Sequence, residues 1–378
     1  MSAWMWISLL LPGAAAQELP PCAERATFRD PPWINGRRYC LETVIEDPEA
    51  GELAFTALAV APDGTLYAAR PLHGQVLAIT DTNADGLPDT SRIVAEGLTL
   101  PNGLTYHEGA LYIAGGRHLY RLMGGAVEIL ADDLPVGSSG WAGDLAVGPD
   151  ERLYLSIGAS CDFCEPDQPE HGAILSLALD GSDRMLVATG LRQAAGLAFR
   201  DGVLWATDSA RLGLAATPDL DELNQVTPGA QFGWPICIGV DRRPDPDAAD
   251  FDCTATTAPA LTFPTGSTPL GLAAYDSDTL PDLASSLLVV LNGSRDRPDL
   301  RGYALAVIPF DTADEPQAAV PLIPVETDSS RKVGYTVAEM NYRGSGFWPH
   351  RPYDVTVSPQ GWIYLSVGGG QIMAVRPR

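Results

Sequence analysis

Residues 57–70 read ALAVAPDGTLYAAR, which is a short alternating apolar strand, a turn of Pro, Asp and Gly, and a second strand with an aromatic residue. This pattern is typical of a β-hairpin. Five further segments repeat it: GLTYHEGALYIAGG at 103–116, DLAVGPDERLYLSIG at 144–158, GLAFRDGVLWATDS at 196–209, GLAAYDSDTLPDLASSLLVVLNGS at 271–294 and DVTVSPQGWIYLSVG at 354–368. The hairpin therefore occurs six times, and an internal repeat of this length decides the fold.

Further apolar stretches follow the hairpins, such as QVLAIT at 75–80 and QIMAVRP at 371–377. Four strands per repeat and hardly a long amphipathic helix predict an all-β fold, a six-bladed β-propeller with four-stranded antiparallel blades. The last repeat reaches Arg378 after three strands, so we expect a strand at 39–45 to complete it. Insertions at 209–270 and 311–350 are expected on one face, where they would build a ligand site.

The composition excludes several classes of function. The 378 residues include 24 Lys and Arg against 48 Asp and Glu, which gives a formal net charge of −24. So large an acidic excess repels polyphosphate and anionic lipid, so we expect neither nucleic acid nor a membrane surface as a partner. A chain that is 46% hydrophobic and 19% charged is expected to fold, here as one domain over 17–378.

The first residues resemble a secretory signal peptide. An apolar run at 4–11 precedes Pro12-Gly13, and Ala14 to Ala16 form a small-residue cleavage site. We expect cleavage after Ala16 and export to the periplasm or the medium. No other window reaches the roughly 18 apolar residues that a transmembrane helix needs, so no membrane insertion is expected.

The six cysteines fall in three local couples: Cys22 with Cys40, Cys161 with Cys164, and Cys237 with Cys253. In an oxidising compartment we expect three short-range disulfides, although six cysteines allow about 15 pairings. The CxxC at 161–164 is followed by Glu165, whereas a c-type haem site needs a His there. A structural staple is favoured over a redox pair.

The segment DTNADGLPD at 81–89 carries a candidate metal site. Asp81, Asn83, Asp85 and Asp89 surround Gly86 at a spacing that lets oxygen ligands converge on calcium. The twelfth-position Glu of an EF-hand is missing, so a turn built from Asn, Asp and Gly is an equal alternative. The five histidines show no HxH or HExxH spacing, which argues against zinc or iron.

Several longer motifs of the sequence resemble those of a known protein family. The run PDLDELNQVTPGAQFGWPICIG at 218–239, with ATGLRQAAGLAF at 188–199, resembles the glucose/sorbosone dehydrogenase family. The likeness extends to DTNADGLPD, YLSIGASCDFC, PLGLAAY with LNGSRDR, and the C-terminal RPYDVTVSPQGWIYLSVGGGQIMAV. It covers nearly all of the chain after residue 50.

The resemblance implies a six-bladed propeller that binds pyrroloquinoline quinone with calcium, oxidises an aldose or a sugar-derived aldehyde, and passes electrons to a separate acceptor. By this resemblance Arg192, Gln193, Arg297 and Arg351 correspond to cofactor-binding positions. The quinone carries three carboxylates, so Arg side chains suit its pocket. The alternative is ordinary surface Arg paired with the acidic residues of this chain.

The chain departs from the family at the expected base. Gly140 stands where the family has a catalytic His, Ala159 where soluble glucose dehydrogenases have an acid, and Asp276 where a cofactor-binding Lys is expected. No His lies between 119 and 170. Asp144 is a possible substitute, if its pKa were raised toward neutrality.

Two other classes of function stay open. One is a calcium-dependent hydrolase of the gluconolactonase type, which LPNGLTY at 100–106 and ATDS at 206–209 resemble, with Asn102 and Asp208 at the metal. The other is a non-catalytic propeller that has lost its base and binds a sugar or a protein, for which Gly140 is the direct argument.

Overall fold

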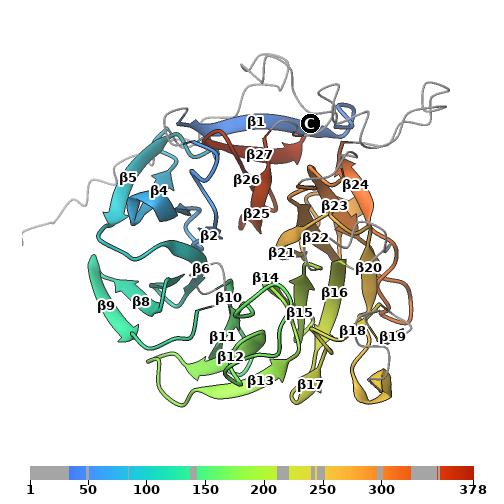
Figure 1. The fold of residues 1–378 in the computed structure, drawn as a ribbon. Helices are drawn as coiled ribbons and strands as arrows, with labels where there is room; N and C mark the ends of the chain where they lie inside the picture. The colour runs from blue at the N-terminus through green and yellow to red at the C-terminus, as the bar shows by residue number, and fades with distance from the viewer. Residues whose placement is uncertain are drawn as a thin grey trace, which may run out of the picture.

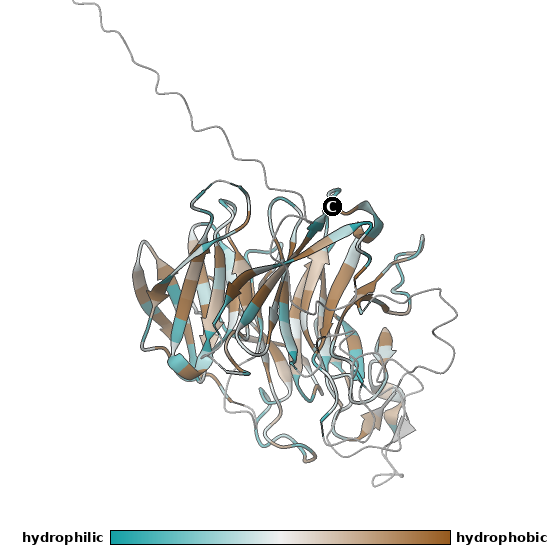
Figure 2. Ribbon diagram, turned by 90° about the horizontal axis from the view of Figure 1, so that it is seen from above, coloured by the Kyte–Doolittle hydropathy of each residue, from teal (hydrophilic) through white to brown (hydrophobic). Residues whose placement is uncertain are grey.

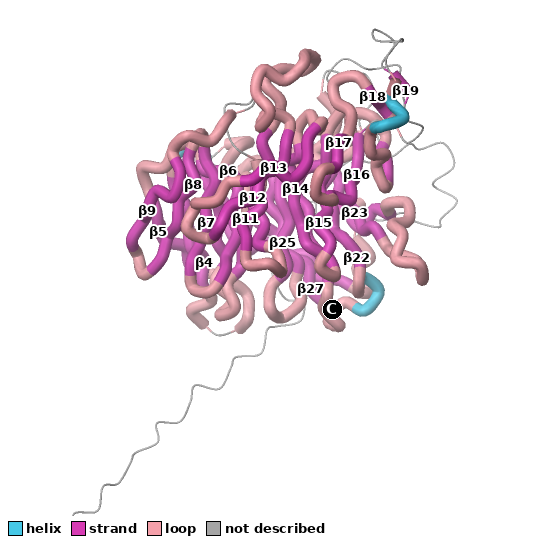
Figure 3. The backbone as a smooth tube through the Cα atoms, turned by 90° about the horizontal axis from the view of Figure 1, so that it is seen from below, coloured by secondary structure: helices cyan, strands magenta, loops and turns pink. Residues whose placement is uncertain are grey.

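The structure is a computed structural model that describes residues 34–47, 51–83, 85–136, 143–210, 221–239, 243–244, 252–295, 301–324, 347 and 350–378. Six antiparallel sheets stand around a central axis, as Figure 1 shows in a view along that axis. The predicted six-bladed β-propeller is confirmed. Apart from short 3₁₀ turns, the described residues contain no helix, and strands and loops make up Figure 3 almost entirely.

The first three blades follow the chain in order, and the innermost strand of each comes first. Blade one contains β2 (Leu58–Val60), β3 (Leu66–Arg70), β4 (Gln75–Thr80) and β5 (Thr90–Ala95). Blade two contains β6 (Pro101–His107), β7 (Ala110–Gly115), β8 (His118–Met123) and β9 (Ala126–Ala131). Blade three contains β10 (Leu145–Val147), β11 (Arg152–Ile157), β12 (Ala173–Ala178) and β13 (Met185–Thr189), and β17 (Ala230–Gln231) adds a parallel edge to β13.

The last three blades carry the longer connections. Blade four contains β14 (Ala194–Arg200), β15 (Val203–Asp208), β16 (Asp221–Val226) and β20 (Leu261–Phe263), with the small ribbon β18 (Cys237–Ile238) and β19 (Arg243–Pro244) before β20. Blade five contains β21 (Pro269–Tyr275), β22 (Ser286–Leu291), β23 (Ala304–Ile308) and β24 (Val320–Ile323). Blade six contains β25 (Pro352–Val357), β26 (Ile363–Val367), β27 (Gln371–Pro377) and β1 (Tyr39–Glu46).

Blade six joins the two ends of the described chain. Strand β1 pairs antiparallel with β27, from Tyr39 opposite Pro377 to Glu46 opposite Gln371, with a register shift between Thr43 and Ile45. The pairing carries a buried ion pair, in which Arg376 Nε donates to Glu42 Oε2 at 2.9 Å. An N-terminal strand therefore covers an edge that would otherwise expose unpaired backbone groups.

The apolar core is divided among the interfaces between blades. Six clusters of buried hydrophobic side chains occur, and each draws its members from two adjacent blades. Because side chains alternate across a strand, β22 packs Leu287 and Val289 against blade four and Leu288 and Val290 against blade six. Figure 2 shows brown, hydrophobic positions along the strands. Each sheet is therefore buried on both faces.

The innermost strands enclose a central channel of about 300 Å³. Asp144 at the start of β10 and Asp354 in the first part of β25 line it, from blades three and six, on opposite sides of the ring. Asp144 Oδ2 accepts the N–H of Leu197 at 2.8 Å, and Asp354 Oδ2 accepts the N–H of Leu58 at 2.6 Å. Each carboxylate therefore ties its own blade to the next one. We call the end of the ring at which the innermost strands begin the strand-start face.

The channel carboxylates should make stability depend on pH. Burial raises the pKa of Asp144 from 3.8 to about 7, and burial together with the charge of Asp144 raises the pKa of Asp354 well above its ordinary value. A raised pKa means that the folded chain holds the proton more tightly, so this stabilisation is complete below about pH 4 and is lost as the pH rises through 7.

We therefore expect the free energy of unfolding, measured in urea, to fall between pH 5 and pH 8. The Asp144→Asn variant should show a weaker fall, because it no longer titrates at this position. It should also lose about 1–3 kcal/mol at pH 5, since one main-chain N–H loses its acceptor. An equally steep fall in that variant would contradict the assignment to Asp144.

Candidate functional site

The two main motifs of the family resemblance, GLRQ and DELN with FGWP, meet at the strand-start face. The N–H of Trp234 donates to the carbonyl of Gly190 at 2.9 Å, and the N–H of Phe232 donates to that of Thr189 at 2.9 Å. The FGWP segment thus packs along the GLRQ segment. Gly190 has a φ of +75°, and a Cβ there would meet the backbone N of Gly233 at 2.6 Å, which explains the glycine. DELN forms the start of β16, where Asp221, Glu222, Leu223 and Asn224 are all buried.

Arg192 lies at this face, in the turn before β14, and is neutralised by an acid. Its Nε and Nη2 atoms lie 2.8 and 2.6 Å from Asp162 Oδ1, and Nη1 donates to the carbonyl of Ser209 at 3.2 Å. The Arg192 side chain is 12% exposed and that of Asp162 is 42% exposed. The guanidinium is thus held in place, with its acidic partner on the more open side.

Asp208, at the end of β15, fixes the backbone of the same turn. Its two carboxylate oxygens accept the N–H groups of Arg192 at 2.9 Å and Gln193 at 2.6 Å. Burial raises the pKa of Asp208 to about 6, while these two hydrogen bonds oppose the rise. A metal ion would have to compete with both N–H groups, so Asp208 is poorly placed as the ligand that the lactonase alternative requires. Asn102 lies in β6, two blades away.

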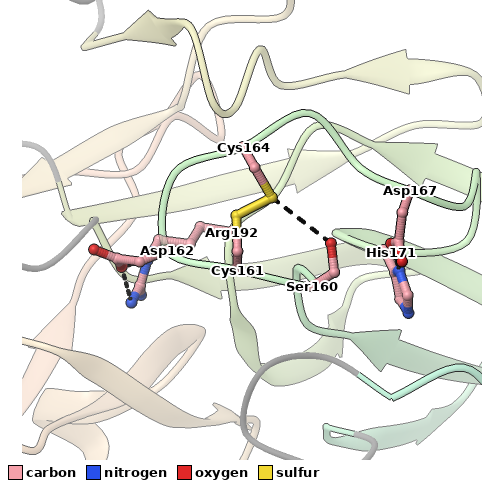
Figure 4. The surroundings of a disulfide bond; sticks show 7 residues. All are labelled: Ser160, Cys161, Asp162, Cys164, Asp167, His171 and Arg192. Atoms are coloured by element: carbon pink, nitrogen blue, oxygen red, sulfur yellow. Dashed lines mark hydrogen bonds and ion pairs between the residues drawn. A yellow bond between two sulfur atoms is a disulfide. The ribbon is translucent and has the colours of Figure 1, made fainter.

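A disulfide closes the loop beside Arg192. Cys161 pairs with Cys164, and Cys237 pairs with Cys253, so two of the three predicted couples are confirmed. Cys40 is also disulfide-bonded, but its predicted partner Cys22 lies outside the described residues. Asp162 sits between the two bridged cysteines (Figure 4), so the staple helps to present this carboxylate to Arg192.

The same loop carries a carboxylate-bound histidine. His171 Nδ1 lies 2.5 Å from Asp167 Oδ1, and the residue is 6% exposed. Hydrogen bonds from His171 and Ser160 lower the pKa of Asp167. Gly172 has a φ of +63° and accepts the N–H of Leu191 at 3.0 Å, so the loop passes directly against the GLRQ turn.

Arg351 lies before β25 at the same face and is held differently from Arg192. Its guanidinium donates to main-chain carbonyls, to Gly293 at 2.7 Å and Ser294 at 2.9 Å, and it lies 4.8 Å from the centre of the Tyr303 ring. In the described part of the chain no carboxylate forms an ion pair with this guanidinium. Its positive charge is therefore left for another anion.

Arg295 adds a second cation near Arg351. Burial lowers the pKa of Arg351, and the charge of Arg295 adds to the lowering. Burial raises the pKa of Tyr353 to about 12, with further effects of Glu52, Arg295 and Arg351. Glu52 accepts the backbone N–H of Arg351 at 3.0 Å. A half-buried Arg351 and an exposed Arg295 therefore form a pair of like charges that a bound anion would stabilise.

The candidate calcium loop lies at the other end of the ring. It connects β4 to β5, and a Cβ on Gly86 would meet the Trp362 ring, which belongs to the turn after β25. Asn83 Oδ1 accepts the N–H of Asp85 at 2.9 Å, Asp81 Oδ2 accepts that of Gly86 at 2.6 Å, and Asp89 Oδ1 accepts the hydroxyl of Thr82 at 2.8 Å. Asp81 Oδ1 is buried without a partner. A cation held here would be remote from Arg192 and Arg351.

Some sequence-predicted positions fall elsewhere. Gly140 and Arg297 lie outside the described residues. Asp276 follows β21, so it lies at the end of the ring away from the strand-start face. Ala159 lies beside Arg192, whose carbonyl accepts the Ala159 N–H at 2.7 Å. The pKa of about 7 at Asp144 meets the condition set for a substitute base, yet both of its oxygens accept main-chain N–H groups, from Leu145 and Leu197.

Sequence reasoning missed Arg295 and His171. Arg295 stands two residues before Arg297 in LNGSRDR, so the motif itself contained the signal for a second cation. His171 lies one residue beyond the interval 119–170 that contains no His, and its spacing of four from Asp167 was the available signal.

Comparisons with known proteins agree with the resemblance. A sequence model of the family described as Glucose / Sorbosone dehydrogenase matches residues 126–294, and one described as TrAA12-like matches residues 214–377. The predicted resemblance to glucose/sorbosone dehydrogenases is thereby confirmed. No curated protein sequence matches the chain significantly.

Solved structures share the fold. The iodide structure of the Trichoderma reesei Carbohydrate-Active Enzymes Family AA12 protein is 16% identical, with a TM-score of 0.75 over 94% of this chain and 99% of its own. The holo form of the pyranose dehydrogenase PQQ domain from Coprinopsis cinerea is 17% identical, with a TM-score of 0.71 over 93% and 98%. The PQQ-bound aldose sugar dehydrogenase from Streptomyces coelicolor is 17% identical, with a TM-score of 0.59 over 90% and 99%. At these identities the likeness establishes the propeller fold.

The turn that carries Arg192 should depend on Asp208. We expect Asp208→Ala to lower the free energy of unfolding by about 2–5 kcal/mol, because two N–H groups lose their acceptor. Asp201→Asn is the matched control, since Asp201 is an exposed partner of Arg200 and its loss should cost about 0–1 kcal/mol. Urea unfolding of both variants tests this, and equal losses would contradict the role of Asp208.

Proposed function

We propose that this chain, whose resemblance to the glucose/sorbosone dehydrogenases rests on residues 126–294, is an oxidoreductase that uses pyrroloquinoline quinone to oxidise an aldose or a sugar-derived aldehyde. The observation that supports this most directly is the pair Arg351 and Arg295. It places two cations at the strand-start face, and the guanidinium of Arg351 is already oriented by main-chain carbonyls.

The residues at this face fit the chemistry of the cofactor. Its three carboxylates need cationic partners, and Arg351 with Arg295 would hold one of them without first breaking an ion pair. The bound quinone supplies a hydride acceptor, which no side chain can replace. The protein then has to orient the sugar, exclude water and accept a proton.

Arg192 differs from Arg351 in that its guanidinium is already bound to a carboxylate. Asp162 already neutralises it, so an arriving carboxylate would share the guanidinium with Asp162 or displace it. We assign Arg192 and Gln193 a secondary place in the cofactor site, on the sequence resemblance, and Arg297 likewise. The alternative that these are ordinary surface Arg side chains paired with acidic residues applies to Arg192 more than to Arg351.

The remaining parts of the proposal concern calcium, the compartment and the acceptor. We propose that Asp81, Asn83, Asp85 and Asp89 hold a calcium ion that stabilises the turn between β4 and β5 and takes no part in the reaction.

The two disulfides and the signal-peptide pattern support export. In the described residues no helix is long and apolar enough to cross a membrane. Electrons would leave through a separate acceptor.

A second candidate function is a non-catalytic propeller that binds a sugar or a protein. It is favoured by Gly140 at the position where the family has its base. The two candidates differ in one measurement, because both could bind the quinone or a sugar, but only the oxidoreductase reduces bound quinone when an aldose is added.

The first test of the proposal is a calorimetric titration of metal-stripped protein with pyrroloquinoline quinone and calcium, followed by a panel of aldoses. We expect binding, and then reduction of the quinone seen in its absorption spectrum. Arg351→Gln should weaken binding at least tenfold, because a charge-assisted contact is worth about 1.5–3 kcal/mol. Arg184→Gln, which removes an ion-paired Arg before β13, is the control.

Binding without reduction would favour the non-catalytic propeller. No binding by the wild-type protein would overturn the cofactor proposal and move the lactonase or partner-binding alternatives forward. Equal affinities for wild type and Arg351→Gln would show that the cations at this face do not hold the cofactor.

The calcium proposal predicts a separate effect on stability. Millimolar calcium should raise the melting temperature of the wild-type protein, and a double Asp81→Asn, Asp85→Asn variant should lose this rise. Asp311→Asn is a matched control, because Asp311 also accepts several hydrogen bonds within a turn that connects two strands. A calcium-dependent rise that survives in the double variant would place the ion elsewhere.

A further inference from the structure

One histidine at the strand-start face has a geometry that the proposed function has not yet used. His171 is buried, and its Nδ1 lies 2.5 Å from Asp167 Oδ1. A carboxylate only accepts hydrogen bonds, so Nδ1 carries the proton and Nε2 carries the lone pair of the neutral imidazole. Asp167 therefore fixes both the tautomer and the orientation of the ring.

The Nε2 atom of this ring is available. In the parts of the chain that the structure describes, nothing forms a hydrogen bond with it. The residue as a whole is 6% exposed. A buried histidine with one nitrogen fixed and the other open is arranged to accept a proton.

The position of His171 ties it to the candidate site. The residue after it, Gly172, accepts the N–H of Leu191 at 3.0 Å, and Leu191 precedes Arg192. Ala159, at the other end of the same loop, donates to the carbonyl of Arg192 at 2.7 Å. Figure 4 shows the Arg192–Asp162 pair and the His171–Asp167 pair on either side of the disulfide. The loop at 158–172 therefore contributes to both pairs: Asp162 lies within the Cys161–Cys164 bridge, and Asp167 and His171 follow it.

We propose that His171 is the catalytic base of this protein and that Asp167 is its positioning residue, an inference that rests on the proposed function. The O–H bond of the sugar breaks and its proton goes to Nε2. A bound quinone would accept the hydride that the adjacent C–H bond releases when it breaks. The C–O bond becomes a carbonyl, so a proton and a hydride are removed together, which balances a two-electron oxidation.

Asp144 is less suited to this role. Each of its carboxylate oxygens already accepts a main-chain N–H, from Leu145 and from Leu197 at 2.8 Å. These contacts fix blade three against blade four, so proton uptake there would disturb the fold. Among the described residues, the one hydrogen bond of the His171 side chain runs from Nδ1 to Asp167, so Nε2 has no such structural contact there.

The kinetic test compares His171→Gln with the wild-type protein after loading with quinone and calcium. We expect the rate of quinone reduction by an aldose to fall about 100-fold or more, with quinone affinity unchanged within twofold, because general bases contribute about 10²–10⁴-fold. Asp167→Asn should slow the reaction less and change the pH profile. His107→Gln is the matched control, since His107 Nε2 also binds an acid, Glu151, but at the other end of the ring.

A second readout needs neither quinone nor turnover. Nitrogen-15 NMR of the histidine rings should show His171 as the Nδ1–H tautomer, assigned by its loss in His171→Gln among five histidines. Asp167→Asn should shift it toward a mixture of tautomers, and an aldose should perturb the Nε2 signal.

The outcomes separate this inference from the proposed function. A wild-type rate in His171→Gln would overturn the inference alone, and so would an Nε2–H tautomer in the wild-type protein. Wild-type protein that binds no quinone would overturn the proposed function and this inference with it. A fall in rate matched by an equal fall in quinone affinity would make His171 a structural residue of the loop.

Discussion

The structure depends on burial of both faces of every sheet by its two neighbours. A strand such as β22, with Leu287 and Val289 facing one blade and Leu288 and Val290 the other, cannot be satisfied in an isolated hairpin. The stabilisation of about 25 cal/mol per Å² of buried apolar surface is gained only when the ring is complete. Closure by β1 against β27, with its buried Glu42–Arg376 pair, is therefore required by the packing of all six blades.

The ring also constrains the roles of the buried carboxylates. Four buried carboxylates each accept at least two main-chain N–H groups toward the strand-start face: Asp144, Asp208, Asp221 and Asp354. They satisfy backbone donors at the points where the chain passes between blades. Such carboxylates lend rigidity to the strand-start face, and the loops that project from it can then carry the chemistry. A perturbed pKa at these positions reflects a structural duty as much as a catalytic one.

The fold could be predicted from the sequence because a hairpin repeated six times leaves its period in the residue pattern. The candidate site was harder to predict from the sequence. Arg192 and Arg351 were named from motifs, yet the sequence could not show that Asp162 neutralises one while carbonyls hold the other, since these partners lie 30 and about 58 residues away. The glycines of GLRQ and FGWP were visible, but their mutual packing was not. Asp276, which stands where the family has a cofactor-binding Lys, follows the far end of β21, and the sequence could not show this distance from the strand-start face.

The loop at 158–172 shows how a propeller can change its chemistry without changing its fold. Its disulfide restrains the residues around Asp162, and main-chain hydrogen bonds of Ala159 and Gly172 hold both ends of the loop to the GLRQ turn, so two ion pairs can be fixed beside a rigid ring. One pair, Asp162–Arg192, lowers the positive charge available to an anion. The other, Asp167–His171, leaves a nitrogen free to accept a proton. A base supplied by this loop would not depend on the residue at position 140, because Asp167 and His171 come from another part of the sequence. The absence of His at one motif position is then weak evidence against activity, since a general base is defined by its orientation and reach rather than by its place in the sequence.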